Sequence, residues 1–121
     1  MKIKTMQVNI RDLPTALNDF VAAGEALARG EIVGREEKVS FVSVEAFRKA
    51  LTPRRLELLH VVKTANPDSI NQLAVLLGRN IKNVTDDVRF LNQIGLLEAE
   101  GKSNRSTPKV DYDEIDLRIA V

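Results

Sequence analysis

The stretch GRNIKNVTDDVRFLNQIG, residues 78–95, combines the spacing of a helix with a polar face that carries positive charge. Its apolar residues recur three or four positions apart, which is the period of an amphipathic helix; they are Ile81, Val84, Val88, Leu91 and Ile94. We therefore predict a helix that begins near Asn80 and ends at Gly95, since glycine readily ends helices. Its outer face would carry Lys82, Asn83, Thr85, Asp86 and Arg89.

Two more helices are predicted directly upstream of this stretch. Thr52-Pro53 starts the first, because threonine caps helices and proline is tolerated at the first helical position, and Asn66-Pro67 ends it. We expect its inner face to carry Leu56, Leu59 and Val62, with Leu58 beside them. Ser69 opens the second helix with Gln72 at the spacing of a capping box, and its apolar residues are Ile70, Leu73, Ala74 and Leu77.

Alternating apolar residues predict strands on both sides of this helical region. Downstream, we expect a strand over residues 96–99, a polar loop over 101–108, and further alternation at Val110 and Tyr112. The apolar phase then slips before Ile115, Leu117, Ile119 and Val121, which predicts a bulge or bend near Asp113-Glu114 and two separate strands.

The first fifty residues predict an extension of mixed structure. Met6, Val8 and Ile10 alternate like a half-buried strand, and Asp12 can cap a helix over residues 13–29 that stops at Gly30. Residues 31–38 are expected to form a loop, and Val39 and Phe41 begin a second strand. Ser43 can cap a short helix that carries Val44, Phe47 and Leu51.

Helix, helix, glycine-containing turn, helix and hairpin, in this order, is the pattern of a winged helix-turn-helix. The predicted fold class is α+β, a winged helix-turn-helix with an N-terminal strand–helix–strand extension. We expect residues 1–50 to form the extension and serve dimerisation, and residues 51–121 to form a DNA-binding domain with a C-terminal strand. The two terminal strands should join one sheet, within the subunit or across a dimer, covered by the helix of residues 13–29.

In such a fold the third helix enters the major groove, and the hairpin, or wing, lies along the DNA backbone. Asparagine can pair with adenine, and arginine or lysine with guanine. The predicted DNA-binding residues are therefore Arg79, Asn80, Lys82, Asn83, Thr85 and Arg89 in the turn and third helix, with Lys102, Asn104, Arg105 and Lys109 in the wing. Asp86 and Asp87 are expected to oppose tight non-specific binding, because each repels phosphate.

Other kinds of function find little support in the sequence. The chain has 121 residues, a net charge of +1 and no cysteine, which excludes disulfides and thiol catalysis. His60 is the only histidine, and the acidic residues from Asp111 to Asp116 lack the spacing of a calcium loop. We expect no enzyme, no metal, no cofactor and no membrane span, and a cytoplasmic protein.

Four short motifs resemble a prokaryotic family of small winged helix-turn-helix proteins. They are LTPxRLxLL at residues 51–59, LGR at 77–79, KNV at 82–84 and YDEI at 112–115. The family comprises DNA-binding, MarR-like transcriptional regulators, some of them antitoxin components of toxin–antitoxin loci. The resemblance implies DNA binding through Lys82 and Asn83, and this chain departs from it by carrying Asp86 where a basic residue is expected.

Two hypotheses follow for the function. The first is a dimeric, sequence-specific transcriptional regulator of double-stranded DNA, which could be an antitoxin that regulates its own operon. The second is a winged helix that binds a protein partner, such as a cognate toxin, with little DNA contact; Asp86, Asp87 and the low net charge favour it. An exposed amphipathic helix with no ligand remains the alternative to both.

Overall fold

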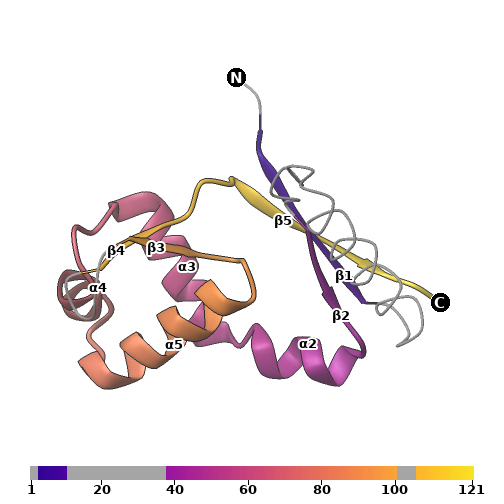
Figure 1. Cartoon of the computed structure of the whole chain (residues 1–121), viewed down its shortest axis with the longest axis horizontal. Helices are drawn as coiled ribbons and strands as arrows, with labels where there is room; N and C mark the ends of the chain where they lie inside the picture. Colours follow the sequence, from indigo (N-terminus) through magenta and orange to yellow (C-terminus); the bar gives the residue numbers. More distant parts are fainter. Residues whose placement is uncertain (1–2, 11–37, 101–105) are drawn as a thin grey trace, which may run out of the picture.

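The computed structural model describes residues 3–10, 38–100 and 106–121 of the chain. The helix expected over residues 13–29, with its cap and its glycine stop, lies outside these ranges, as does most of the expected loop that follows it. Figure 1 shows the remaining elements as a helical part and a three-stranded sheet. Two segments connect these parts: the short helix α2 (Val44–Ala50) and residues 110–113, which follow the wing. The fold is α+β, as predicted.

Three helices and a hairpin form the winged helix-turn-helix. The helices are α3 (Pro53–Ala65), α4 (Ile70–Leu77) and α5 (Ile81–Gln93), and the hairpin pairs β3 (Glu98–Glu100) with β4 (Thr107–Lys109) in antiparallel register. The apolar stripes meet in one core, in which Leu58, Leu73 and Leu91 are fully buried. This order of elements confirms the predicted winged helix-turn-helix.

Local signals set the helix ends as expected. The Thr52 hydroxyl accepts from the Arg55 amide at 3.2 Å, and the Ser69 hydroxyl accepts from the Gln72 amide at 3.1 Å. Asn66 and Gly78 close α3 and α4 in the left-handed region, with φ of 47° and 64°. A residue without a Cβ adopts this backbone at no steric cost, which explains the glycine at the turn.

Several local expectations need correction. Leu56 is 45% exposed, and the inner face of α3 is made by Leu58, Leu59 and Val62. Gln72 does not complete a capping box with Ser69, because its side-chain oxygen accepts from the amide of Asp68 one residue earlier. The boundaries of three strands also differ, since β2 already begins at Lys38, β3 covers residues 98–100 and β4 begins at residue 107 within the expected loop.

The sheet has the order β2-β1-β5, and both of its strand pairs are parallel. β1 (Thr5–Ile10) lies between β2 (Lys38–Phe41) and β5 (Glu114–Ile119). The register sets Val8 beside Val39 and Leu117, and Ile10 beside Phe41 and Ile119, so one face of the sheet is apolar throughout. The prediction that the two terminal strands join one sheet is confirmed, and they do so within the subunit.

Two contacts hold the sheet and its flanking segments to the helical part. Phe41 of β2 meets Phe47 of α2 edge to face, with ring centroids 5.8 Å apart. After the wing, Asp113 forms the expected bend, and its amide donates to the Lys4 carbonyl at 2.7 Å where β1 begins. The phase slip in the sequence is therefore a change of sheet, because β4 pairs in the wing and β5 pairs with β1.

Candidate nucleic-acid interface

The outer face of α5 presents the polar side chains that the sequence places on it. Lys82, Asn83, Asp86 and Arg89 are exposed, whereas Thr85 is half-buried and its hydroxyl donates to the Ile81 carbonyl at 2.7 Å. A shallow depression runs along this face and is lined by Ile81, Lys82, Thr85, Asp86 and Arg89. We call this set of residues, together with Asn83, the α5 face.

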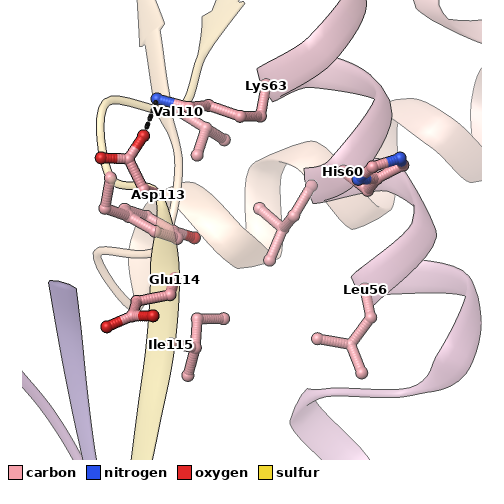
Figure 2. Close-up of a pocket in the computed structure, with 9 residues that line it drawn as sticks. Leu56, His60, Lys63, Val110, Asp113, Glu114 and Ile115 are labelled. Carbon is pink, nitrogen blue, oxygen red and sulfur yellow. Dashed lines mark ion pairs between the residues drawn. The ribbon is translucent and has the colours of Figure 1, made fainter. Parts of the chain in front are cut away.

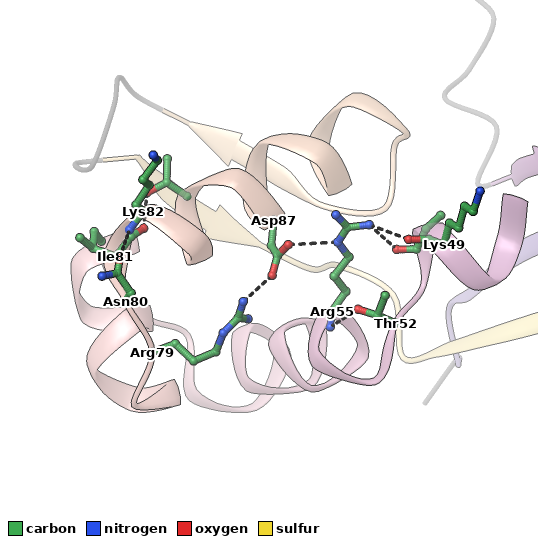
Figure 3. Close-up of polar contacts among 10 residues, drawn as sticks. Lys49, Thr52, Arg55, Arg79, Asn80, Ile81, Lys82 and Asp87 are labelled. Atoms are coloured by element: carbon green, nitrogen blue, oxygen red, sulfur yellow. Dashed lines mark hydrogen bonds and ion pairs between the residues drawn. The ribbon is translucent and has the colours of Figure 1, made fainter.

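Asn80 holds the N-terminus of α5. Its side-chain oxygen accepts from the Lys82 amide at 2.8 Å, so it satisfies one of the amides that the first helical turn leaves free (Figure 3). The Asn80 side chain therefore caps the helix in this structure. The remaining amides of the first turn point away from the helix, with the partial positive charge that attracts anions.

Asp87 does not belong to the α5 face. Its carboxylate lies between two guanidinium groups, with Oδ1 3.1 Å from Arg55 Nε and Oδ2 2.7 Å from Arg79 Nη2 (Figure 3). The three side chains are only 15%, 20% and 17% exposed, in the order Asp87, Arg55, Arg79. The expectation of two phosphate-repelling carboxylates is therefore wrong for Asp87, and only Asp86 lies on the surface.

Arg55 also contacts the junction between α2 and α3. Its Nη1 donates to the carbonyls of Lys49 and Ala50 at 3.0 and 2.9 Å, and its guanidinium lies 4.1 Å from the centroid of the Phe90 ring. One arginine thus ties the end of α2, the start of α3 and the middle of α5 together. Planar guanidinium suits this arrangement, because it donates along several directions and stacks on rings.

The sequence analysis missed the role of Arg55 and Asp87, although a signal was present. Arg55 precedes Leu58, Leu59 and Val62 by three, four and seven positions, so it lies on the inward stripe of α3. Asp87 likewise lies between Val84 and Leu91 on the inward stripe of α5. Opposite charges at inward positions of two neighbouring helices indicate a buried ion pair.

A groove separates α5 from the wing. It has a volume of about 170 Å³, and its lining combines residues of α4, α5 and the wing: Ile70, Thr85, Val88, Arg89, Asn92, Ala99 and Ser106. Arg89 therefore borders both this groove and the α5 face. On the wing, Lys109 lies 3.8 Å from Glu100, and both side chains are more than half exposed. The other predicted wing residues, Lys102, Asn104 and Arg105, lie outside the described residues.

A second hollow, of about 200 Å³, lies between α3 and the segment that leads to β5 (Figure 2). Leu56, His60 and Ile115 line it, and Lys63 Nζ is 3.1 Å from Asp113 Oδ1 at its rim. A hydrogen bond from the Lys4 amide, followed by the contact with Lys63, lowers the pKa of Asp113. Within the described ranges, no group of histidine and carboxylate side chains is arranged to hold a metal ion.

The helices of the described residues include none that is long and apolar enough to cross a membrane.

Comparison with known proteins gave one family and one solved structure. The model of the HVO_A0114 family matches residues 50–117, which is more than half of the chain. The solution structure of a homodimeric winged helix-turn-helix DNA-binding domain from Mycobacterium bovis, a possible ArsR-family transcriptional regulator, is 23% identical in sequence. That likeness has a TM-score of 0.47 and covers 82% of this chain and 70% of the other. A search of curated proteins found no match.

Proposed function

The chain belongs to the HVO_A0114 family, and we propose that it is a sequence-specific, DNA-binding transcriptional regulator that acts as a homodimer. The observation that carries this proposal is the α5 face, on which Lys82, Asn83 and Arg89 are exposed beside a wing. Asp87 is withdrawn from this surface by its two arginines. The charged side chains of the α5 face are therefore two cations, Lys82 and Arg89, and one carboxylate, Asp86.

In the proposed complex the N-terminal half of α5 enters the major groove. Asn83 would pair with an adenine edge, and Lys82 and Arg89 with guanine edges or phosphate oxygens. The amides of the first turn of α5 would hold a phosphate, and Asn80 would keep that turn formed. Thr85 would contact bases through its methyl group, because its hydroxyl is already bonded to the helix backbone.

The remaining predicted residues would position α5 or contact the DNA backbone. Arg79 would act through Asp87 by fixing α5 against α3, since its guanidinium is mostly buried. Lys102, Asn104, Arg105 and Lys109 of the wing would contact phosphates, which position a protein on DNA without reading sequence. We further propose that residues 1–50 serve dimerisation together with β5, whose sheet they share, and that the helices and wing of residues 51–121 bind DNA.

The test is binding of the full chain to DNA from upstream of its own gene. Asn83→Ala and Arg89→Ala should each weaken the specific complex by roughly tenfold or more, because a bidentate base contact is worth about 1–3 kcal/mol. Arg48→Ala is the matched control, since it removes an exposed guanidinium from α2. If both α5 variants bind as tightly as the wild type, the proposed reading surface is wrong.

A second candidate is a protein-binding role, such as neutralising a toxin. It is favoured by Val75 and Leu76, which are 80% and 50% exposed on α4. Apolar side chains at such exposure can mark a protein contact. Co-purification with the product of the neighbouring gene, lost in Val75→Ser/Leu76→Ser, would support this role. Retention of the partner by that variant would count against it.

A further inference from the structure

The outer edge of β5 carries no partner strand in the part of the chain that the structure describes. β5 is six residues long and pairs only with β1, on its other side (Figure 1). Edge strands are commonly protected by charged side chains, above all lysine, by proline or by short length. β5 contains no proline or lysine, and its charged residues, Glu114, Asp116 and Arg118, are of both signs, whereas the opposite edge strand, β2, has four residues and begins with a lysine. We propose that β5 pairs with β5 of a second copy, antiparallel and across a twofold axis.

The hydrogen bonds of β5 show which of its backbone groups are available. The amide of Glu114 donates to the Lys4 carbonyl at 3.3 Å, and that of Ala120 donates to the Ile10 carbonyl at 3.2 Å. In a strand, successive residues direct their backbone groups to opposite edges. The amides and carbonyls of Ile115, Leu117 and Ile119 therefore point to the outer edge, where a second β5 would bind.

Charge selects one register for this pairing. When Leu117 lies opposite Leu117 of the second copy, Ile115 lies opposite Ile119, and Asp116 lies opposite Arg118 on both sides of the axis. Shifting the strands by two residues in one direction sets Glu114 against Arg118 but also Asp116 against Asp116, and shifting them in the other direction sets Arg118 against Arg118. Opposite charges directly across an antiparallel pair are favourable and like charges are not. Of these registers, the one centred on Leu117 alone combines opposite-charge pairs with no like-charge pair.

The apolar face of the sheet supports the same partner. On this face the side chains of β1 are buried, with Val8 at 0% and Ile10 at 5% exposure. Their neighbours on β5, Leu117 and Ile119, are 39% and 51% exposed. A second β5 would continue this face across the axis and bring the exposed side chains against their equivalents. The interface would be isologous, as in most homodimers.

The pairing deepens the proposed function, because it names the interface through which two DNA-binding units are joined, and it rests on that function for their purpose. It is tested without DNA, by sedimentation equilibrium of the full chain. The wild type should be a dimer. Asp116→Arg and Arg118→Asp should each weaken self-association by roughly tenfold or more, since two like-charge pairs replace two ion pairs.

A mixture of the two variants provides the decisive measurement. Asp116→Arg chains carry cations at both positions 116 and 118, and Arg118→Asp chains carry anions at both, so the two variants should pair with each other about as tightly as wild-type chains. Ser40→Arg is the control, because it adds a cation to the polar face of β2 at the opposite edge and should leave the dimer intact. Unfolding curves check that each variant folds.

A monomeric wild type, single variants that associate normally, or a mixture that fails to associate would each overturn the proposed interface. These results are independent of DNA binding. A chain that dimerises through β5 and binds no DNA would refute the proposed function and uphold the interface. A chain that binds DNA specifically as a monomer would refute the interface and the homodimer, and uphold the DNA-binding role.

Discussion

Arg55 and Asp87 join the first and third helices of the helix-turn-helix through a 3.1 Å contact between Nε and Oδ1. The same carboxylate receives Arg79 from the turn before α5 at 2.7 Å. The orientation of α5 is therefore fixed by a charge cluster at its inner face. Of the two adjacent aspartates, Asp86 is the one that lies on the outer face. This separation of two adjacent aspartates gives each a different predicted effect.

Asp87→Asn should destabilise the fold by about 2–3 kcal/mol, because it leaves two mostly buried guanidinium groups without a counter-charge. Asp86→Asn is the matched control, since the same change on the exposed neighbour should alter stability by less than about 0.5 kcal/mol. Urea unfolding of both variants measures the difference. Equal stability of the two variants would contradict the structural role of the Asp87 cluster.

Two charged residues of the α5 face, Asp86 and Lys82, should affect the affinity for DNA in opposite directions. Asp86→Asn removes a carboxylate from the α5 face, and we expect tighter binding to DNA of any sequence, since a phosphate-repelling charge is lost. Lys82→Ala should weaken binding and reduce the slope of log affinity against log salt by about 1, the value for one phosphate contact. Titrations at several salt concentrations measure both effects. An unchanged slope in Lys82→Ala would exclude a phosphate contact by this residue.

Asp113 should make stability depend on acid pH. Its pKa is lowered in the folded state by the Lys4 amide and by Lys63, so its contribution is complete above the unfolded pKa of about 3.9 and is lost as pH falls through the lower folded value. Asp113→Asn should therefore be less stable than the wild type at neutral pH. The difference should shrink on acidification below about pH 4. Chemical unfolding across this range tests the direction, and a pH-independent difference would contradict it.

Tyr112→Phe should cost about 1–2 kcal/mol, because the buried hydroxyl donates to the Leu96 carbonyl at 2.7 Å and its removal leaves that acceptor unsatisfied. Burial also raises the pKa of Tyr112, so the hydroxyl remains a donor at neutral pH. This bond ties the segment before β5 to the end of α5. Thermal unfolding measures the loss, with the exposed Asp111→Asn as a control for changes in the same segment. A fully stable Tyr112→Phe would show that the bond contributes nothing.

Most helices and strands of the described residues could be predicted because their signals act over a few residues. Ser43, Thr52 and Ser69 cap helices through amides three positions away, and the glycine of the turn before α5 sets a left-handed backbone locally. The alternation of Met6, Val8 and Ile10 likewise predicts a strand with one apolar face. The polar residues of the α5 face followed from the same periodicity.

Tertiary structure decided the contacts between residues that are distant in the chain. The Arg55–Asp87 ion pair spans 32 positions, and the pairing of β1 with β5 spans 109. Periodicity places Asp87 on a face of α5 but cannot supply the guanidinium that makes burial of its charge favourable. The sequence predicts that β1 and β5 join one sheet but not that they are adjacent and parallel, because any strand edge offers the same backbone groups. The sequence thus determines the helices and strands and their apolar faces, and packing determines which charges are buried and which strands are neighbours.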